Sequence, residues 1–211
     1  MEPTIYKPSI YKGAGIYNTG ADSGGFTPIS GSVELFGKIY NTIKINGLEW
    51  ICENIDYKWD GLLIGHNTTS PQACYPQDDE SLWGWNGRKC GLLYNKNAKI
   101  QLNGILNDWR VGSLNDYDKL LLSCGSYFNA NKNLTKSSDW SSLVGLDTIG
   151  FSELACGAYE SLFYETNTAW YVHVNDINAD MITCRPEENY RINYSQYTAN
   201  WYLPIRLCRD A

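Results

Sequence analysis

The amino-acid sequence predicts an α+β protein, because three patterns follow one another along the chain. Short runs of alternating apolar and polar residues, typical of strands, occupy residues 33–57. A helix signal follows Gly112, and from Gly150 to the chain end the pattern returns to short strands and loops. Strands before and after a helical part, without a repeating strand–helix unit, favour short, twisted antiparallel strands with two helices and long loops.

Residues 1–32 are predicted to form an extended N-terminal arm. The triplet IYK occurs at 5–7 and 10–12 and IYN at 16–18, interleaved with Pro and Gly. This stretch has too few aliphatic residues to build its own core, so we expect it to become ordered only against another surface. It is either a disordered terminus or an anchor to a larger assembly. The globular domain is predicted to span residues 33–211.

The domain begins with two or three short strands. Apolar positions such as Ile43 and Ile45 alternate with polar ones, and Asn46-Gly47 before the next apolar run is a hairpin signal. Residues 59–90 are rich in Gly, Asn, Pro, Asp and Trp without steady periodicity, so they are predicted to form long loops.

The clearest helix is predicted for residues 113–124, SLNDYDKLLLSC. Ser113 is a typical N-cap and Asp116 stands at the third helical position, while Gly125 ends the helix. One face of this helix carries four apolar or aromatic residues: Leu114, Tyr117, Leu120 and Leu121. A second, weaker helical stretch is predicted through residues 129–140.

The segment ENYRINYSQYTAN, residues 188–200, stands out among the strands and loops after Gly150. It holds three Tyr and three Asn in thirteen residues, with almost no aliphatic pattern. Tyr offers a large flat surface with a polar tip, and Asn offers both a donor and an acceptor, so the mixture suits contact with a varied partner. Taken alone, the segment favours the other interpretation, a solvated edge strand or hairpin, because Tyr favours strands and Asn favours turns.

Composition and charge narrow the classes of function. The chain has 211 residues, 43% hydrophobic and 14% aromatic, and its net charge is −6. A domain of this size buries about 70% of its unfolded surface and needs no covalent staple. The negative charge argues against nucleic acid as a partner, which needs a clustered positive field. We find no leader-like start and no apolar stretch long enough for membrane insertion, so we expect a soluble protein or an exported one whose leader has been removed.

Cysteines and histidines give no sign of a cofactor or metal centre. No CxxC motif is present, so neither a zinc knuckle nor a thioredoxin-like motif is expected. We expect scattered buried thiols in a reducing compartment, with a bridge between distant cysteines as the alternative. The only histidines, His66 and His173, lie far apart, and His173 in the strand-like WYVHV is expected to be structural. The seven cysteines are Cys52, Cys74, Cys90, Cys124, Cys156, Cys184 and Cys208.

The chain resembles a known family through motifs in a fixed order. These motifs are TIKINGLEWICENIDY at 42–57, GLLYN at 91–95, DWRVGSLNDYDKLL at 108–121, NLTKSSDW with GFSEL within 133–154, and PIRLCRD at 204–210. In this order they resemble the Fibrobacter succinogenes major paralogous domain, a family regarded as having a C-type-lectin-like fold. The sequence departs from the family pattern in two places: GILNDW lacks the usual Cys-Pro pair, which leaves the redox state of Cys208 open, and Gly112 replaces the usual Pro.

The resemblance implies a loop-rich surface that binds ligands. The chain is also similar to variable proteins of diversity-generating retroelements, in which adenine-directed mutation rewrites a segment just before the chain end. Residues 188–200 have that composition and that place, immediately before PIRLCRD. With this context the binding interpretation is favoured, because Tyr and Asn tolerate water when unbound and make varied contacts when bound. The predicted ligand-binding residues are Asn189, Tyr190, Arg191, Asn193, Tyr194, Gln196, Tyr197, Asn200 and Tyr202, with Trp201 and Tyr202 supporting the face from beneath.

We therefore expect the protein to be a non-enzymatic module that recognises a ligand. The lack of a leader-like start and the Tyr- and Gly-rich arm suggest a phage virion, with the arm on a tail or fibre and the domain as a tail tip that binds a host-surface protein or glycan. A homotrimer would suit this setting. A bacterial surface adhesin, a structural virion protein and an enzyme related to formylglycine generation are the alternatives. The last depends on a particular cysteine pair, and no matching motif surrounds Cys156, Cys184 or Cys208. A calcium site at 174–176 and 186–189 is a weaker possibility, since the lectin-like motifs occur there in reverse order.

Overall fold

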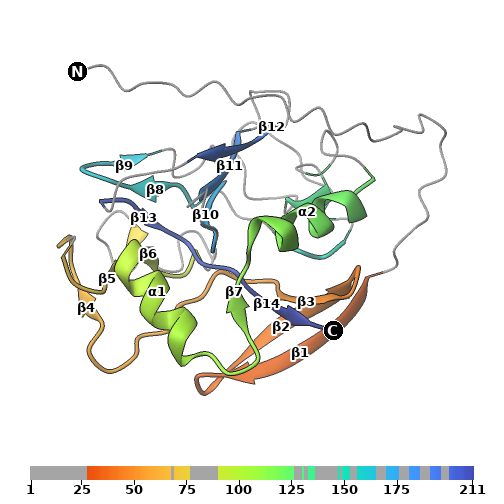
Figure 1. Ribbon diagram of the computed structural model, residues 1–211, viewed down its shortest axis with the longest axis horizontal. Helices are drawn as coiled ribbons and strands as arrows, with labels where there is room; N and C mark the ends of the chain where they lie inside the picture. The colour runs from red at the N-terminus through yellow and green to blue at the C-terminus, as the bar shows by residue number, and fades with distance from the viewer. Residues whose placement is uncertain are drawn as a thin grey trace.

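The protein is an α+β protein with two helices and several sheets of mostly antiparallel strands, as the computed structural model shows (Figure 1). Most of the predicted arm, residues 1–27, lies outside the part of the chain that the structure describes. No helix of the described part is long and apolar enough to cross a membrane. The described residues are 28–67, 69–76, 90–125, 130, 133–135, 147, 149–152, 156–164, 170–175, 181–185, 191–195 and 200–211.

The first sheet joins the beginning of the domain to its end. Two tight hairpins connect its first three strands, with positive φ angles at Phe36-Gly37 and at the predicted turn Asn46-Gly47. The sheet begins at Ile29, earlier than the predicted domain boundary at Val33. Its strands, in spatial order, are β1 (Ile29–Leu35), β2 (Lys38–Ile45), β3 (Leu48–Ile51), β14 (Leu207–Asp210) and β7 (Arg110–Val111).

Two further sheets contain the remaining strands. The predicted loop region 59–90 contributes two short strands, β4 and β5, which pair in parallel. The six-stranded sheet has the order β4 (Leu63–Ile64), β5 (Gln72–Cys74), β6 (Leu93–Asn95), β13 (Tyr202–Leu203), β8 (Ala158–Tyr159) and β9 (Phe163–Tyr164). The three-stranded sheet has the order β10 (Trp170–His173), β11 (Met181–Arg185) and β12 (Arg191–Ser195).

Helix α2 (Leu114–Ser123) confirms the predicted helix. Ser113 is the N-cap and forms a reciprocal capping box with Asp116, so two backbone N–H groups of the first turn are satisfied. Gly125 follows the helix with a φ of 86°, the left-handed conformation that glycine adopts most easily. The buried face comprises Asp116, Tyr117, Leu120 and Leu121.

Helix α1 (Lys96–Ile105) was not predicted from the sequence. Asn95 caps it by accepting a hydrogen bond from the backbone N–H of Ala98, and Ala98 and Leu102 are buried one turn apart. In the weaker predicted stretch 129–140, Ala130, Asn133 and Leu134 are helical, and the other residues except Thr135 lie outside the described part.

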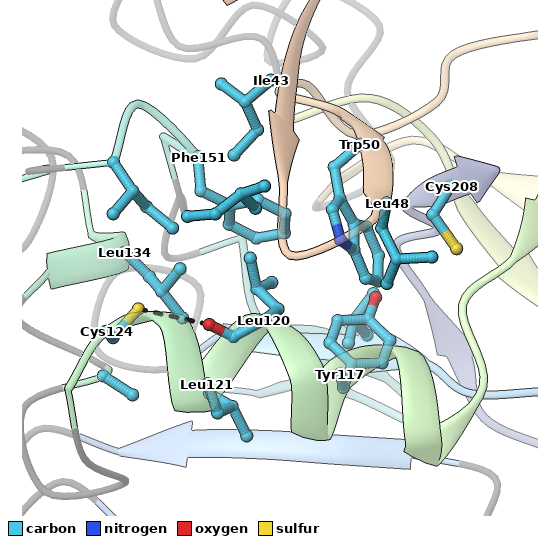
Figure 2. Close-up of a cluster of buried hydrophobic side chains, with 14 of the residues drawn as sticks. Ile43, Leu48, Trp50, Tyr117, Leu120, Leu121, Cys124, Leu134, Phe151 and Cys208 are labelled. Carbon is cyan, nitrogen blue, oxygen red and sulfur yellow. Dashed lines mark hydrogen bonds between the residues drawn. The ribbon is translucent and has the colours of Figure 1, made fainter. Parts of the chain in front are cut away.

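The larger part of the core lies between α2 and the first sheet (Figure 2). Trp50 of β3 is central, with its ring centroid 4.8 Å from that of Tyr117 and 5.6 Å from that of Phe151. Gly112 lies directly against these rings, and a Cβ atom there would come within 2.8 Å of both Trp50 and Tyr117. This contact explains why a glycine precedes the helix cap.

The expectation that the buried cysteines are all free thiols is wrong for one pair. Cys90 and Cys156 form a buried disulfide, with their Cα atoms 5.5 Å apart. No local pattern indicates this pairing, since the partners are separated by 66 positions and are brought together by the fold. Four other cysteines are buried as thiols: Cys52, Cys74, Cys124 and Cys208. The redox state that the sequence left open for Cys208 is therefore that of a thiol.

Candidate recognition surface

The structure places five of the nine predicted ligand-binding residues. Arg191, Asn193 and Tyr194 belong to β12, Asn200 is exposed in the turn before β13, and Tyr202 is in β13. The other four lie outside the described residues: Asn189, Tyr190, Gln196 and Tyr197.

Among the described strands, β12 is one of the two outer strands of the three-stranded sheet. Its register places Tyr194 across from Ile182, which in turn lies across from Val172, and both of these are fully buried. Asn193 lies across from Thr183 instead. Consecutive positions of a strand belong to opposite faces of a sheet, so β12 divides the predicted residues between two faces. The other interpretation of this segment, a solvated edge strand or hairpin, also predicts an edge strand here.

Tyr202 lies beneath the surface. It is fully buried, and its hydroxyl donates a hydrogen bond to the backbone oxygen of Asn67 at 2.8 Å. Its burial raises its pKa to about 12. In the sheet, Tyr202 lies between Asn95 of β6 and Tyr159 of β8. Tyr202 is therefore placed to support the surface, one of its two predicted roles.

An aromatic cluster covers this part of the six-stranded sheet. It comprises His66, Tyr159, Phe163 and Tyr202 and is called the aromatic cluster below. The exposed ring of His66 has its centroid 4.0 Å from that of Tyr159 and 5.7 Å from that of Tyr202. Phe163 lies across from Tyr159 in the sheet, with ring centroids 4.8 Å apart. The cluster thus presents an exposed imidazole on a base of buried and half-buried rings.

The loop that carries His66 is fixed by hydrogen bonds on both sides of the histidine. The backbone N–H of Gly65 donates to the backbone oxygen of Ala73 at 2.9 Å. The backbone N–H of Asn67 donates to Oε1 of Gln72 at 2.6 Å, and the Asn95 side chain donates to the Asn67 oxygen at 3.1 Å. Sequence reasoning missed this role of His66, because its partners come from residues far apart in the chain.

A small apolar cluster connects the aromatic cluster to β12. Trp201 packs against Ala158, Met181 and Leu203, which come from β8, β11 and β13. Met181 lies across from Ser195 at the end of β12. In Figure 1, β12 and the β8–β9 hairpin lie at the same end of the molecule, away from β1 and β2. We call β12, Asn200, Trp201 and the aromatic cluster together the candidate surface.

Buried Arg206 holds in place the part of the chain that directly follows the candidate surface. Its guanidinium donates to Oδ1 of Asn54 at 2.7 Å and to the backbone oxygens of Phe151 and Ser152 at 2.9 and 3.0 Å. It also lies over the Phe151 ring, 4.6 Å from the centroid. Because several acceptors satisfy this buried charge, the chain directly after Tyr202 has one defined position.

His173 confirms the expectation that it is structural. It is fully buried, its backbone N–H donates to the oxygen of Pro204 at 3.0 Å, and Nε2 lies 2.6 Å from the backbone oxygen of Tyr94. Burial disfavours the charged imidazolium and lowers the pKa of His173 to about 3. The neutral imidazole therefore ties β10 to β6, and the backbone N–H of the same residue ties β10 to the residue that follows β13.

Cysteine-based catalysis and metal binding gain little support from the described residues. Cys156 is in a disulfide, and burial raises the pKa of the Cys208 thiol, which weakens it as a nucleophile. Within the described ranges, no three His, Cys, Asp or Glu side chains gather where they could hold a metal ion. Asp176 and residues 186–189 of the weaker calcium prediction lie outside those ranges.

Comparison of the chain with protein-family models, with curated proteins and with solved structures gives no significant match.

Proposed function

We propose that the protein is a recognition module with a C-type-lectin-like fold, and that it binds its ligand through the candidate surface. The observation that carries the proposal is the position of the Tyr- and Asn-rich segment. Its described part includes β12, an outer strand of a small sheet whose middle strand, β11, packs through Met181 against Leu203, beside buried Tyr202. Such a base lets the β12 positions on the other face from Tyr194, such as Arg191 and Asn193, change without disturbing the core.

The residue types on the surface fit recognition better than catalysis. Tyr, His and Asn provide flat apolar contact together with donors and acceptors, as the contact loops of antibodies do. A surface built in this way accepts several ligand chemistries, so changes of sequence in β12 alter which ligand binds. This property suits a segment that retroelement-directed mutation diversifies.

The proposed setting is a phage tail tip or a bacterial surface adhesin, where the ligand is a host-surface protein or glycan. In the phage setting, residues 1–32 would attach the domain to a tail or fibre. A homotrimer there would add avidity to weak individual sites. A purely structural virion protein is the alternative without a ligand, and no contact of the described residues favours the formylglycine-related enzyme.

Binding arrays test the proposal. The labelled chain is applied to an array of glycans and an array of purified bacterial surface proteins. The variant R191A/N193A changes two predicted ligand-binding positions on one face of β12, and the matched control I39A/N41A changes two exposed positions of β2 in the first sheet. We expect a ligand whose signal falls at least about tenfold in the first variant, the loss of about 1.4 kcal/mol of binding free energy, and is unchanged in the control. Blank arrays, or equal losses in both variants, contradict the proposal.

A further inference from the structure

The disulfide Cys90–Cys156 stands at one end of the sheet that carries the aromatic cluster. Cys90 precedes β6 and Cys156 precedes β8, and these two strands lie on either side of β13. Both are antiparallel to β13, so β6 and β8 run in the same direction and begin at the same end of the sheet. The bridge therefore joins the starts of two strands that flank Tyr202.

The disulfide belongs to a buried network rather than to a loop at the surface. The Asn54 side chain donates to the backbone oxygen of Cys90 at 2.9 Å and approaches Sγ of Cys156 at 3.5 Å. Its Oδ1 accepts the hydrogen bond from Arg206. Between the bridge and β6, Gly91 has a φ of 71°, and a Cβ atom there would lie 2.6 Å from the backbone oxygen of Ile55. The backbone is thus closely fitted around the bridge.

We propose that this disulfide assembles the candidate surface, so that the surface forms only where the folding chain meets an oxidant. The bridge fixes the separation of β6 and β8, and with it the row Asn95, Tyr202 and Tyr159 on which His66 rests. Without the bridge, the β8–β9 hairpin keeps its short strand pairings and the packing of Ala158, Tyr159 and Phe163 but loses its covalent link to the start of β6, whereas the first sheet and α2 keep their own core. The inference concerns the surface itself and holds whatever ligand it binds.

The reaction needs an external disulfide as oxidant, of the class of oxidised glutathione or a disulfide oxidoreductase. The thiolate of one cysteine attacks the external disulfide and releases one thiol, and the thiolate of the second cysteine then displaces the other. Two protons and two electrons leave the pair, and the external disulfide becomes two thiols. Such oxidants are typical of the periplasm, the extracellular medium and the oxidising steps of secretion.

Peptide mapping is the first test. Wild-type chain refolded with oxidised and reduced glutathione is alkylated in denaturant and digested without reductant. We expect one linked species that contains Cys90 and Cys156. Alkylation of both residues, or a link from either one to another cysteine, overturns the proposal.

Hydrogen exchange then tests the effect on the surface. In C90S/C156S we expect amides of residues 157–164 and 202–203 to exchange at least about tenfold faster, while those of β2, β3 and α2 change little. The control C52A/C124A removes two buried thiols outside the bridge and should not produce this local difference. Uniform acceleration, or no acceleration, contradicts the proposal. If C90S/C156S does not fold, wild-type chain refolded with and without oxidised glutathione is compared by near-ultraviolet circular dichroism, and identical native spectra contradict it.

Discussion

The hydroxyl of Tyr202 donates a hydrogen bond to the backbone oxygen of Asn67 at 2.8 Å, across 135 positions of sequence. This bond holds the loop of His66 over the strand that follows the Tyr- and Asn-rich segment. The bond thereby joins this loop to β13, directly after that segment in the chain. The candidate surface depends on this long-range contact as much as on its own residues.

Replacing Tyr202 by Phe should loosen the His66 loop without unfolding the protein. The change leaves the oxygen of Asn67 with one hydrogen bond fewer, and the expected loss is about 1 kcal/mol of unfolding free energy. Urea denaturation measures it. Y75F, at a half-buried tyrosine whose hydroxyl contacts Lys58, serves as the control and should cost less. Equal losses would show that the Tyr202 hydroxyl has no special role.

Replacing Arg206 by Lys should be strongly destabilising although the charge is kept. An ammonium group cannot reproduce the guanidinium geometry that reaches Asn54, Phe151 and Ser152. We expect a loss of about 3 kcal/mol or more, because backbone acceptors in the core lose their donors. Chemical denaturation gives the unfolding free energies of R206K and of K44R, a control at an exposed site, for comparison. A loss below about 1 kcal/mol in R206K would contradict the assigned role of this side chain.

Two glycine-to-alanine changes should have opposite signs. At Gly112, the new methyl group meets Trp50 and Tyr117, so we expect a loss of about 1–3 kcal/mol. At Gly104 in α1, no atom lies within 4 Å of the new Cβ, so we expect a gain of about 0.5–1 kcal/mol from better helix propensity. Thermal and urea unfolding of both variants measure the signs. A stabilised G112A would contradict the packing described around Trp50.

Stability should fall as pH decreases from 6.5 towards 3 because of His173. The pKa of His173 is lowered to about 3 in the folded protein from 6.5 in the unfolded chain. Between these two pH values the unfolded chain binds a proton at this residue and the folded chain does not. Above pH 6.5 both states are neutral at this residue and its contribution is constant. At pH 5 the expected loss is about 2 kcal/mol relative to pH 7.

The variant H173Q isolates this contribution. We expect it to be less stable than the wild type at pH 7 and to show a much weaker loss between pH 7 and pH 5 in urea titrations. An identical pH dependence in both proteins would mean that the imidazole becomes protonated without unfolding.

Local signals explain which elements the sequence predicts well. Ser113 and Asp116 form the capping box that their spacing predicts, and Asn46-Gly47 forms the predicted hairpin turn. Helix α1 was missed because its sequence, KNAKIQLNGI, is polar and contains a glycine, so its position depends on packing of Ala98 and Leu102 against the core.

The long-range features could not be predicted in the same way. Neither the Cys90–Cys156 bridge nor the ring contact of His66 with Tyr159 leaves a pattern within a short window of sequence. Both arise where separate strands of one sheet meet. The composition of residues 188–200 does predict a strand-forming, polar and aromatic segment, and Arg191–Ser195 form β12. The packing of Trp201 against Met181 of β11 is a consequence of the fold.

The most direct test of the central claim is deep sequencing of the 3′ end of this gene across the population that carries it. The account predicts substitutions concentrated at adenine-bearing codons of residues 186–200, with Tyr202, Arg206 and the rest of PIRLCRD unchanged. Equally low variation along the whole region would contradict a diversified recognition surface on β12.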